Sequence, residues 1–153
     1  MAKIVPPLKA MRREELDAAT EAFGKGPEGF FVRGRHGVTH CTIDGEGPLV
    51  ILSHGLGTSM HIYDEFVPLL TQAGFRCLRF DFFNHGFSLA DDTFIKYTNE
   101  VAVDQMQDIL DAIVGRDNPT IQSIIGHSTG GIFGILASLC QLHTHDCNEG
   151  QRL

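Results

Sequence analysis

The feature that most constrains the fold is a glycine-rich turn around one serine, placed between a strand-like and a helix-like segment. Gly126, His127, Ser128, Thr129 and Gly130 follow the apolar run TIQSIIG (120–126) and lead into GGIFGILASLC (130–140). A G-x-S-x-G pattern in this context predicts a sharp strand-to-helix turn that presents the serine hydroxyl at the carboxyl edge of a sheet. Glycines are expected on both sides because the turn leaves no space for Cβ atoms beside the serine.

From residue 48 onward the chain alternates between strand-like and helix-like patterns. PLVILSHG (48–55) is typical of a strand buried on both faces, and FRCLRFD (75–81) predicts a second strand. Between them we expect a helix at about 61–73, its apolar side formed by Ile62, Phe66, Leu69 and Leu70. An amphipathic helix from Asn99, as N-cap, to about Gly115 precedes the strand at 120–126. This alternation predicts an α/β fold with a mostly parallel sheet and flanking helices.

The residues before 48 differ from this pattern. Residues 8–23 have a loose helical spacing of apolar side chains, and Gly24, Gly26 and Pro27 end it. GFFVRG and GVTHCTI, within residues 28–44, predict an antiparallel hairpin, which makes the sheet mixed. We therefore divide the chain into an N-terminal helical extension (1–27), an α/β region (28–140) and an irregular tail (141–153).

Composition excludes several classes of partner and cofactor. The net charge is −7 and no basic block exceeds Arg12-Arg13, so we expect no nucleic-acid partner. The four cysteines have no C-x-x-C spacing and no phosphate-binding glycine loop is present, so neither a metal nor another cofactor is indicated. The apolar runs are too short to span a bilayer, and the N-terminus lacks the apolar core of a signal peptide. A cytoplasmic location without integral membrane contact is the expectation.

Two further motifs follow the first two buried strands. Transfer of an acyl group to serine requires two backbone N–H donors for the developing oxyanion. We expect them from Thr129, directly after the serine, and from Leu56 in the turn His54-Gly55-Leu56-Gly57. His54 is expected to shape this loop through hydrogen bonds rather than to act as a base. In the second motif, DFFNHGFS (81–88), we expect Asp81, His85, Gly86 and Ser88 to build the turn.

At these three motifs the chain resembles the α/β-hydrolase superfamily, and within it the fold-1 group of serine esterases, lipases and lactonases. HGLGTS is similar to the HG-x oxyanion loop of the family, DFFNHGFS to its D-x-x-G-x-G-x-S turn, and GHSTGG to its GHSxGG elbow. The resemblance covers roughly residues 28–140 and implies the N-terminal half of an α/β-hydrolase domain. Asn84 stands where the family usually has its first glycine, and Asn tolerates the left-handed conformation better than other residues with a side chain.

The resemblance implies that Ser128 is the nucleophile of a hydrolase acting on a small acyl substrate. Related haloalkane dehalogenases and epoxide hydrolases carry Asp at the elbow, so Ser128 favours carboxylic ester, thioester or lactone bonds. The acid and the histidine of the family follow later strands. The tail offers only His143, His145, Asp146 and Glu149, in the wrong order, so we expect this chain to be truncated and inactive.

Two alternatives stay open from the sequence. One is a non-catalytic interaction protein that pairs through an exposed sheet edge, because the strand at 120–126 would lack a neighbour on one side. Self-association through that edge is the corresponding expectation. The other is an acyltransferase on the same fold, in which another acceptor replaces water.

Overall fold

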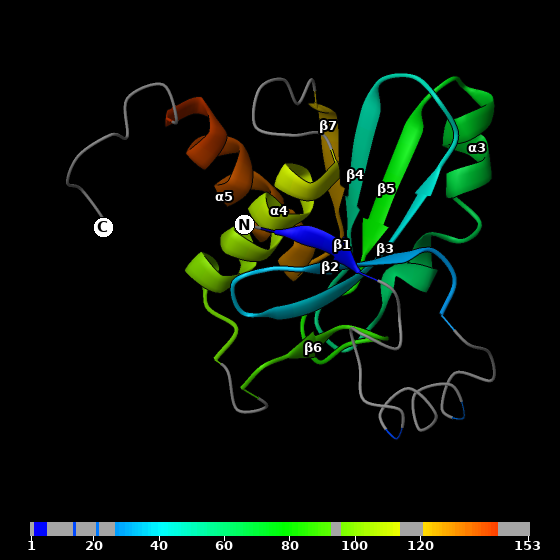
Figure 1. Cartoon of the computed structure of the whole chain (residues 1–153). Helices are drawn as coiled ribbons and strands as arrows, with labels where there is room; N and C mark the ends of the chain where they lie inside the picture. Colours follow the sequence, from blue (N-terminus) through cyan, green and yellow to red (C-terminus); the bar gives the residue numbers. More distant parts are fainter. Residues whose placement is uncertain are drawn as a thin grey trace.

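A seven-stranded sheet with helices on both faces forms the molecule (Figure 1). The computed structural model describes residues 2–5, 14, 21, 27–92, 96–113 and 121–143, of which residues 140–143 are described in their backbone only. The strands are β1 (Lys3–Val5), β2 (Phe30–Arg33), β3 (Gly37–Asp44), β4 (Leu49–Ser53), β5 (Arg76–Phe80), β6 (Leu89–Ala90) and β7 (Ile121–Gly126). The helices are the 3-10 helix η1 (Met60–Tyr63), α3 (Val67–Gln72), α4 (Asn99–Ile113) and α5 (Thr129–His143).

The strand order is β1-β2-β3-β5-β4-β7, and β6 pairs with β3 off this path. β2 and β3 form the antiparallel hairpin that the sequence predicts, and β3 continues antiparallel to β5. β4 lies between β5 and β7 and runs parallel to both. The mixed sheet of an α/β fold is therefore confirmed. The prediction that it is mostly parallel is wrong for the described residues, because four of the six strand pairings are antiparallel. β1 and β6 are additional short strands that the sequence patterns do not predict.

The two sheet faces are covered by different helices, and β4 contributes alternate side chains to each. Leu49 and Ile51 belong to the larger core, which includes Met106 of α4 and Phe133 of α5. Val50 and Leu52 pack on the other face, against η1 and α3. All five residues of β4 are buried, as expected for a strand covered on both faces. The loop after β4 therefore follows a strand whose five residues are all buried.

The segment between β4 and β5 differs from its prediction. In place of one helix over 61–73, the 3-10 helix η1 ends at Tyr63 and α3 begins at Val67, with Pro68 in its first turn. Tyr63 and Val67 are buried, whereas Ile62, Phe66 and Leu69 are exposed. Of the predicted apolar side, only Leu70 packs against the core. The other three positions are wrong, because a 3-10 turn and a break rotate the later residues away from the α-helical count.

Three further expectations concern the ends of segments. The N-cap of α4 is Thr98, not Asn99: the Thr98 carbonyl accepts from the Ala102 N–H, and its hydroxyl accepts from Val101 N–H. The predicted helix at 8–23 lies outside the described residues, apart from Glu14 and Glu21. α5 reaches His143, three residues into the predicted tail, and the residues after it also lie outside the described ones. None of the described helices is long and apolar enough to cross a membrane.

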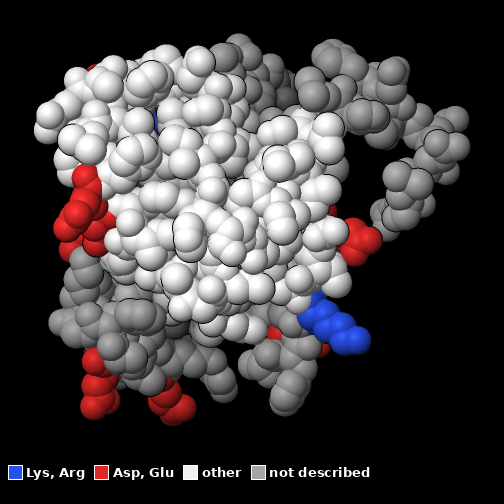
Figure 2. All heavy atoms as spheres, turned by 180° about the vertical axis from the view of Figure 1, so that it is seen from behind, with Lys and Arg blue, Asp and Glu red and all other residues white. Residues whose placement is uncertain are grey.

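β7 forms one edge of the sheet in the part of the chain that the structure describes. Residues 121–143, which comprise β7 and α5, contain no Asp, Glu, Lys or Arg. Ile132, Ile135 and Leu139 of α5 expose half of their surface or more. Figure 2 shows the molecule from behind, and the charged side chains in this view lie at the margins. An uncharged edge strand thus lies next to an exposed apolar helix face.

Candidate active site

Ser128 lies at a strained turn between β7 and α5. Its φ angle is +53°, a region that residues with a side chain rarely adopt, and its side chain is exposed. A Cβ atom on Gly126 would lie 2.3 Å from the Gly131 nitrogen, and one on Gly130 would lie 2.1 Å from the Ser53 carbonyl oxygen. The turn therefore brings backbone against backbone at both glycines that flank the serine.

The loop after β4, residues 54–59, contacts the elbow at Gly55. A Cβ atom on Gly55 would lie 3.0 Å from His127 Nδ1 and 3.2 Å from the Ser128 Cβ. The His127 N–H also donates to the Ser53 carbonyl at 3.0 Å. The elbow is thus hydrogen-bonded to the last residue of β4 and in contact with the loop that follows it.

Leu56 and Thr129, the two predicted oxyanion donors, lie next to these contacts. Leu56 follows Gly55 in the loop and its side chain is 55% exposed. Thr129 is the first residue of α5, whose N-terminal N–H groups have no carbonyl one turn earlier. Neither N–H donates to an acceptor within the described residues. Two unused backbone donors therefore lie next in sequence to residues at the elbow: Thr129 follows Ser128 at the positive end of α5, and Leu56 follows Gly55.

His54 is buried and its ring is held by backbone groups on both sides. Its Nδ1 lies 2.7 Å from the Gly55 carbonyl oxygen, and its Nε2 accepts from the Phe82 N–H at 2.9 Å. Only a neutral ring with the proton on Nδ1 makes both bonds. Burial lowers the pKa of His54 below its ordinary value, in agreement with this form. His54 thereby connects the loop after β4 to the turn after β5.

The turn at 81–88 is organised around the buried Asp81. The Asp81 carboxylate accepts from the N–H groups of Met60 at 2.9 Å and Phe87 at 3.3 Å. Burial acts to raise the pKa of Asp81, but hydrogen bonds from His40 and these N–H groups outweigh it and hold the pKa below its usual value. The Ser88 hydroxyl donates to the Asp81 carbonyl at 2.8 Å. Asp81 therefore joins the turn to the start of η1.

The glycine and the asparagine of this turn both have positive φ. Asn84, where the resemblance leads one to expect glycine, has a φ of +61°, so the predicted tolerance for the left-handed conformation is confirmed. Gly86 has a φ of +51°, and a Cβ atom there would lie 2.0 Å from Asp81 Oδ2. The backbone of Gly86 thus packs directly on the buried carboxylate.

His40 is a residue of this site that sequence reasoning missed. Its side chain is fully buried on β3, with Nδ1 3.1 Å from Asp81 Oδ2 and Nε2 against the Glu28 carbonyl. Both neighbours of the ring, the Asp81 carboxylate and the Glu28 carbonyl, are hydrogen-bond acceptors. The signal in the sequence was weak: one histidine in a strand becomes informative only when its partner across the sheet is known.

A general base for Ser128 is not found among the described residues. No hydrogen bond joins the Ser128 hydroxyl to a histidine or carboxylate there, and His54 uses both ring nitrogens elsewhere. His127 is exposed next to the serine, and no hydrogen bond connects the two side chains. Over the same residues, no cluster of three or more His, Cys, Asp or Glu could hold a metal ion.

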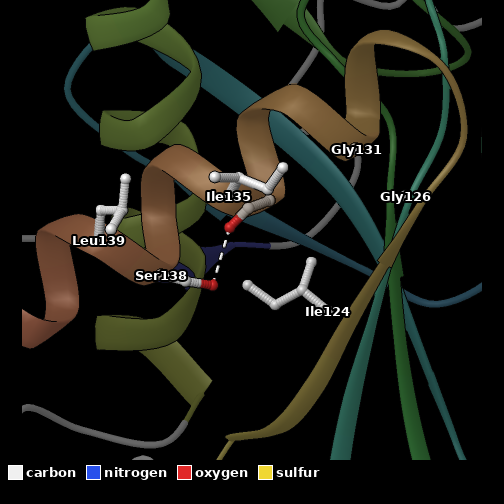
Figure 3. A pocket seen from close by; sticks show the side chains of 7 residues that line it. Ile124, Gly126, Gly131, Ile135, Ser138 and Leu139 are labelled. Carbon is white, nitrogen blue, oxygen red and sulfur yellow. Dashed lines mark hydrogen bonds between the residues drawn. The ribbon is translucent and has the colours of Figure 1, made fainter.

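A groove of about 240 Å³ lies on the other side of the elbow, between β7 and α5 (Figure 3). Its walls are Ile124 of the edge strand and Ile135 and Leu139 of α5, and Gly126 and Gly131 form its end near Ser128. Ser138 lines it as well, but its hydroxyl donates to the Gly134 carbonyl at 2.8 Å. The groove is therefore largely apolar.

Comparison with known proteins identifies the family. The profile of the alpha/beta hydrolase fold family matches residues 48–147. The chain belongs to this family. It is 35% identical over 93 residues to the bifunctional epoxide hydrolase 2 of Sus scrofa. Among solved structures it is similar to a variant epoxide hydrolase of Vigna radiata, with a TM-score of 0.64 and 25% identity. A hydrolase from Pseudomonas aeruginosa is similar with a TM-score of 0.59 and 33% identity.

These matches cover only part of each relative. The match spans 61% of this chain but 16% of the pig protein. The match to the Vigna radiata structure covers 76% of this chain and 35% of that structure's chain. The match to the Pseudomonas aeruginosa structure covers 68% of this chain and 38% of that structure's chain. The chain therefore spans about a third of the length of these solved relatives.

Proposed function

We propose that this chain carries the nucleophile and oxyanion-binding part of a serine hydrolase that acts on carboxylic ester, thioester or lactone bonds. The observation that carries the proposal is the exposed Ser128 in a left-handed turn at the start of α5, flanked by the unused N–H groups of Leu56 and Thr129. This combination supplies a nucleophile and two donors at one sheet edge, as acyl transfer requires.

In the proposed reaction, Ser128 Oγ attacks the carbonyl carbon and loses its proton to a general base. The two N–H groups hold the oxyanion of the tetrahedral intermediate. When it collapses, the bond to the leaving group breaks and that group takes up the proton, which leaves an acyl ester on Ser128. Water then attacks the ester carbonyl, releases the carboxylic acid and restores the hydroxyl.

The names of several relatives suggest a second substrate class, epoxides. A serine that opened an epoxide would form an ether with the substrate carbon. Water does not cleave an ether under neutral conditions, so the enzyme would stay alkylated after one turnover. An acyl ester on Ser128, in contrast, is hydrolysable, because its carbonyl carbon accepts water. The serine at the elbow therefore favours acyl substrates.

Labelling with a fluorophosphonate tests whether Ser128 is the nucleophile. Because no base contacts Ser128 in the described residues, we expect slow labelling of the chain alone and faster labelling when free imidazole is added as base. Ser128→Ala should abolish both. Ser123→Ala, which removes an exposed hydroxyl of β7, should leave labelling unchanged. Equal labelling of Ser128→Ala, or no labelling even with imidazole, would contradict the proposal.

The uncharged β7 edge supports a second function, pairing with another polypeptide strand. An unpaired strand presents free N–H and C=O groups to a partner, and the adjacent α5 face is apolar. We expect the chain to self-associate and Ile135→Glu to weaken this, because Ile135 is 65% exposed beside the edge. Leu69→Glu on α3, 61% exposed, is the matched control. A monomer with cooperative melting in sedimentation and calorimetry would refute the idea.

A further inference from the structure

The loop after β4 and the turn after β5 exchange hydrogen bonds through two histidines. His54 of the loop accepts from the Phe82 N–H of the turn at 2.9 Å. In return, His85 Nε2 of the turn accepts from the Gly57 N–H of the loop at 3.1 Å. The ring centroids of the two histidines are 5.4 Å apart. We call these two side chains, with the N–H groups that they accept, the histidine latch.

Both rings of the latch are fixed in one tautomer. The second nitrogen of each ring, Nδ1, lies near a backbone carbonyl: His54 at 2.7 Å from Gly55 and His85 at 3.0 Å from Phe83. The proton must therefore sit on Nδ1, which leaves the lone pair of Nε2 for the backbone N–H. A second proton would occupy that lone pair and place N–H against N–H, so protonation removes the bond that joins the loops.

From this geometry we propose that His54 and His85 act as a proton-sensitive latch that positions Leu56. Leu56 lies between Gly55 and Gly57, the two loop residues that the latch holds. When both rings are neutral, the loop is fixed on the turn and on the elbow. When either ring gains a proton, its backbone bond is lost and the Leu56 N–H leaves its position. The link to catalysis rests on the proposed function, in which Leu56 is an oxyanion donor.

The surroundings of His54 agree with a neutral ring. Burial lowers the pKa of His54 and outweighs the hydrogen bond to the Gly55 carbonyl, which acts to raise it; the neighbouring His85 acts in the same direction as burial. Asp81 Oδ1 is 3.9 Å from His54 Nε2 and opposes this effect, but its carboxylate is already bonded by the Met60 and Phe87 N–H groups and by His40. The other titratable groups nearby are Tyr97, packed on Phe82, and His127, across Gly55.

Two substitutions of His85 separate the acceptor from its titration. His85→Gln keeps an acceptor that cannot be protonated, whereas His85→Phe keeps a ring without any acceptor. The readout is the amide hydrogen-exchange protection of Gly57 at about pH 7.5 and about pH 5, with Ile51 of β4 as internal reference. In wild type we expect protection of Gly57 to fall about tenfold on acidification while Ile51 is unchanged. His85→Gln should keep protection at both values, and His85→Phe should lack it at both.

Several outcomes would overturn the latch. They are an acid-induced loss in His85→Gln equal to that of wild type, or full protection of Gly57 in His85→Phe at neutral pH. If His85→Phe does not fold, wild type and His85→Gln decide the question alone. His61→Gln, a histidine of η1 paired with Asp64, is the control for general loss of a histidine. Hydrogen exchange at Gly57 does not depend on catalysis. If the fluorophosphonate fails to label Ser128 while Gly57 shows the expected protection, the proposed acyl-enzyme is refuted and the histidine latch is not.

Discussion

Replacing Gly86 by alanine tests how tightly the turn after β5 packs on Asp81. The residue has a φ of +51°, so any side chain costs about 1–2 kcal/mol of backbone strain. The new Cβ would lie 2.0 Å from Asp81 Oδ2, and ordinary contact begins at 3.4 Å, so that oxygen would have to retreat by about 1.4 Å. This oxygen accepts from Phe87 N–H at 3.3 Å and from His40 at 3.1 Å, and such a displacement breaks both bonds.

Each bond to a buried carboxylate contributes about 1.5–3 kcal/mol. Together with the backbone strain, the expected loss in free energy of unfolding for Gly86→Ala is at least about 4 kcal/mol. Gly74→Ala is the matched control, because Gly74 has a φ of +85° and no atom within 4 Å of the added Cβ. It should cost only about 1–2 kcal/mol. Urea unfolding at constant pH gives both values, and a difference below about 1 kcal/mol between the two variants would refute the reasoning.

Three further predictions concern the same region. Ser53→Ala should raise the free energy of unfolding by about 1 kcal/mol, because the Ser53 hydroxyl is buried and has no hydrogen-bond partner in the described residues; a loss in urea unfolding would contradict this. Gly130→Ala should lower the free energy of unfolding by more than about 2 kcal/mol, because the new Cβ would collide with the Ser53 carbonyl. Gly131→Ala has space for the Cβ and should raise the free energy of unfolding by up to about 1 kcal/mol through helix propensity. Thermal melting of the two variants checks both expectations. The pKa of Asp81 is lower in the folded protein than its unfolded value of 3.8, so the ionised carboxylate stabilises the fold above that value, and this stabilisation is lost as pH falls through the folded pKa. The difference in free energy of unfolding between wild type and Asp81→Asn should therefore be constant above about pH 5 and shrink below 3.8. A difference that stays constant down to about pH 2 would count against this prediction.

Features with a local physical cause could be predicted from the sequence. The apolar run of β4 and the glycine turn at Ser128 require nothing but nearby residues to be recognised, and both lie where the patterns place them. Asn84 belongs to the same group, since its left-handed conformation depends on its own side chain. Local stereochemistry and hydrophobic patterning thus account for the strand and the turns that surround the elbow.

Features that depend on distant partners were missed. His40 becomes part of the site only because β3 pairs with β5 and brings its ring next to Asp81, 41 positions away. The reciprocal bonds of His54 and His85 likewise join loops that are 28 residues apart. The buried side of η1 and α3 was missed for another reason: the 3-10 turn changes the angle per residue, which a helical count cannot detect.

The two positions with positive φ in the turn after β5, Asn84 and Gly86, meet different physical requirements. At Asn84 the requirement is conformational, and a side chain that tolerates positive φ meets it. At Gly86 the requirement is also steric, because the Asp81 carboxylate occupies the place of a Cβ atom. Replacing a family glycine by asparagine is therefore acceptable at the first position and not at the second. The departure of this chain from the family pattern falls where the structure can accept it, so the support for the loop that carries Leu56 is retained.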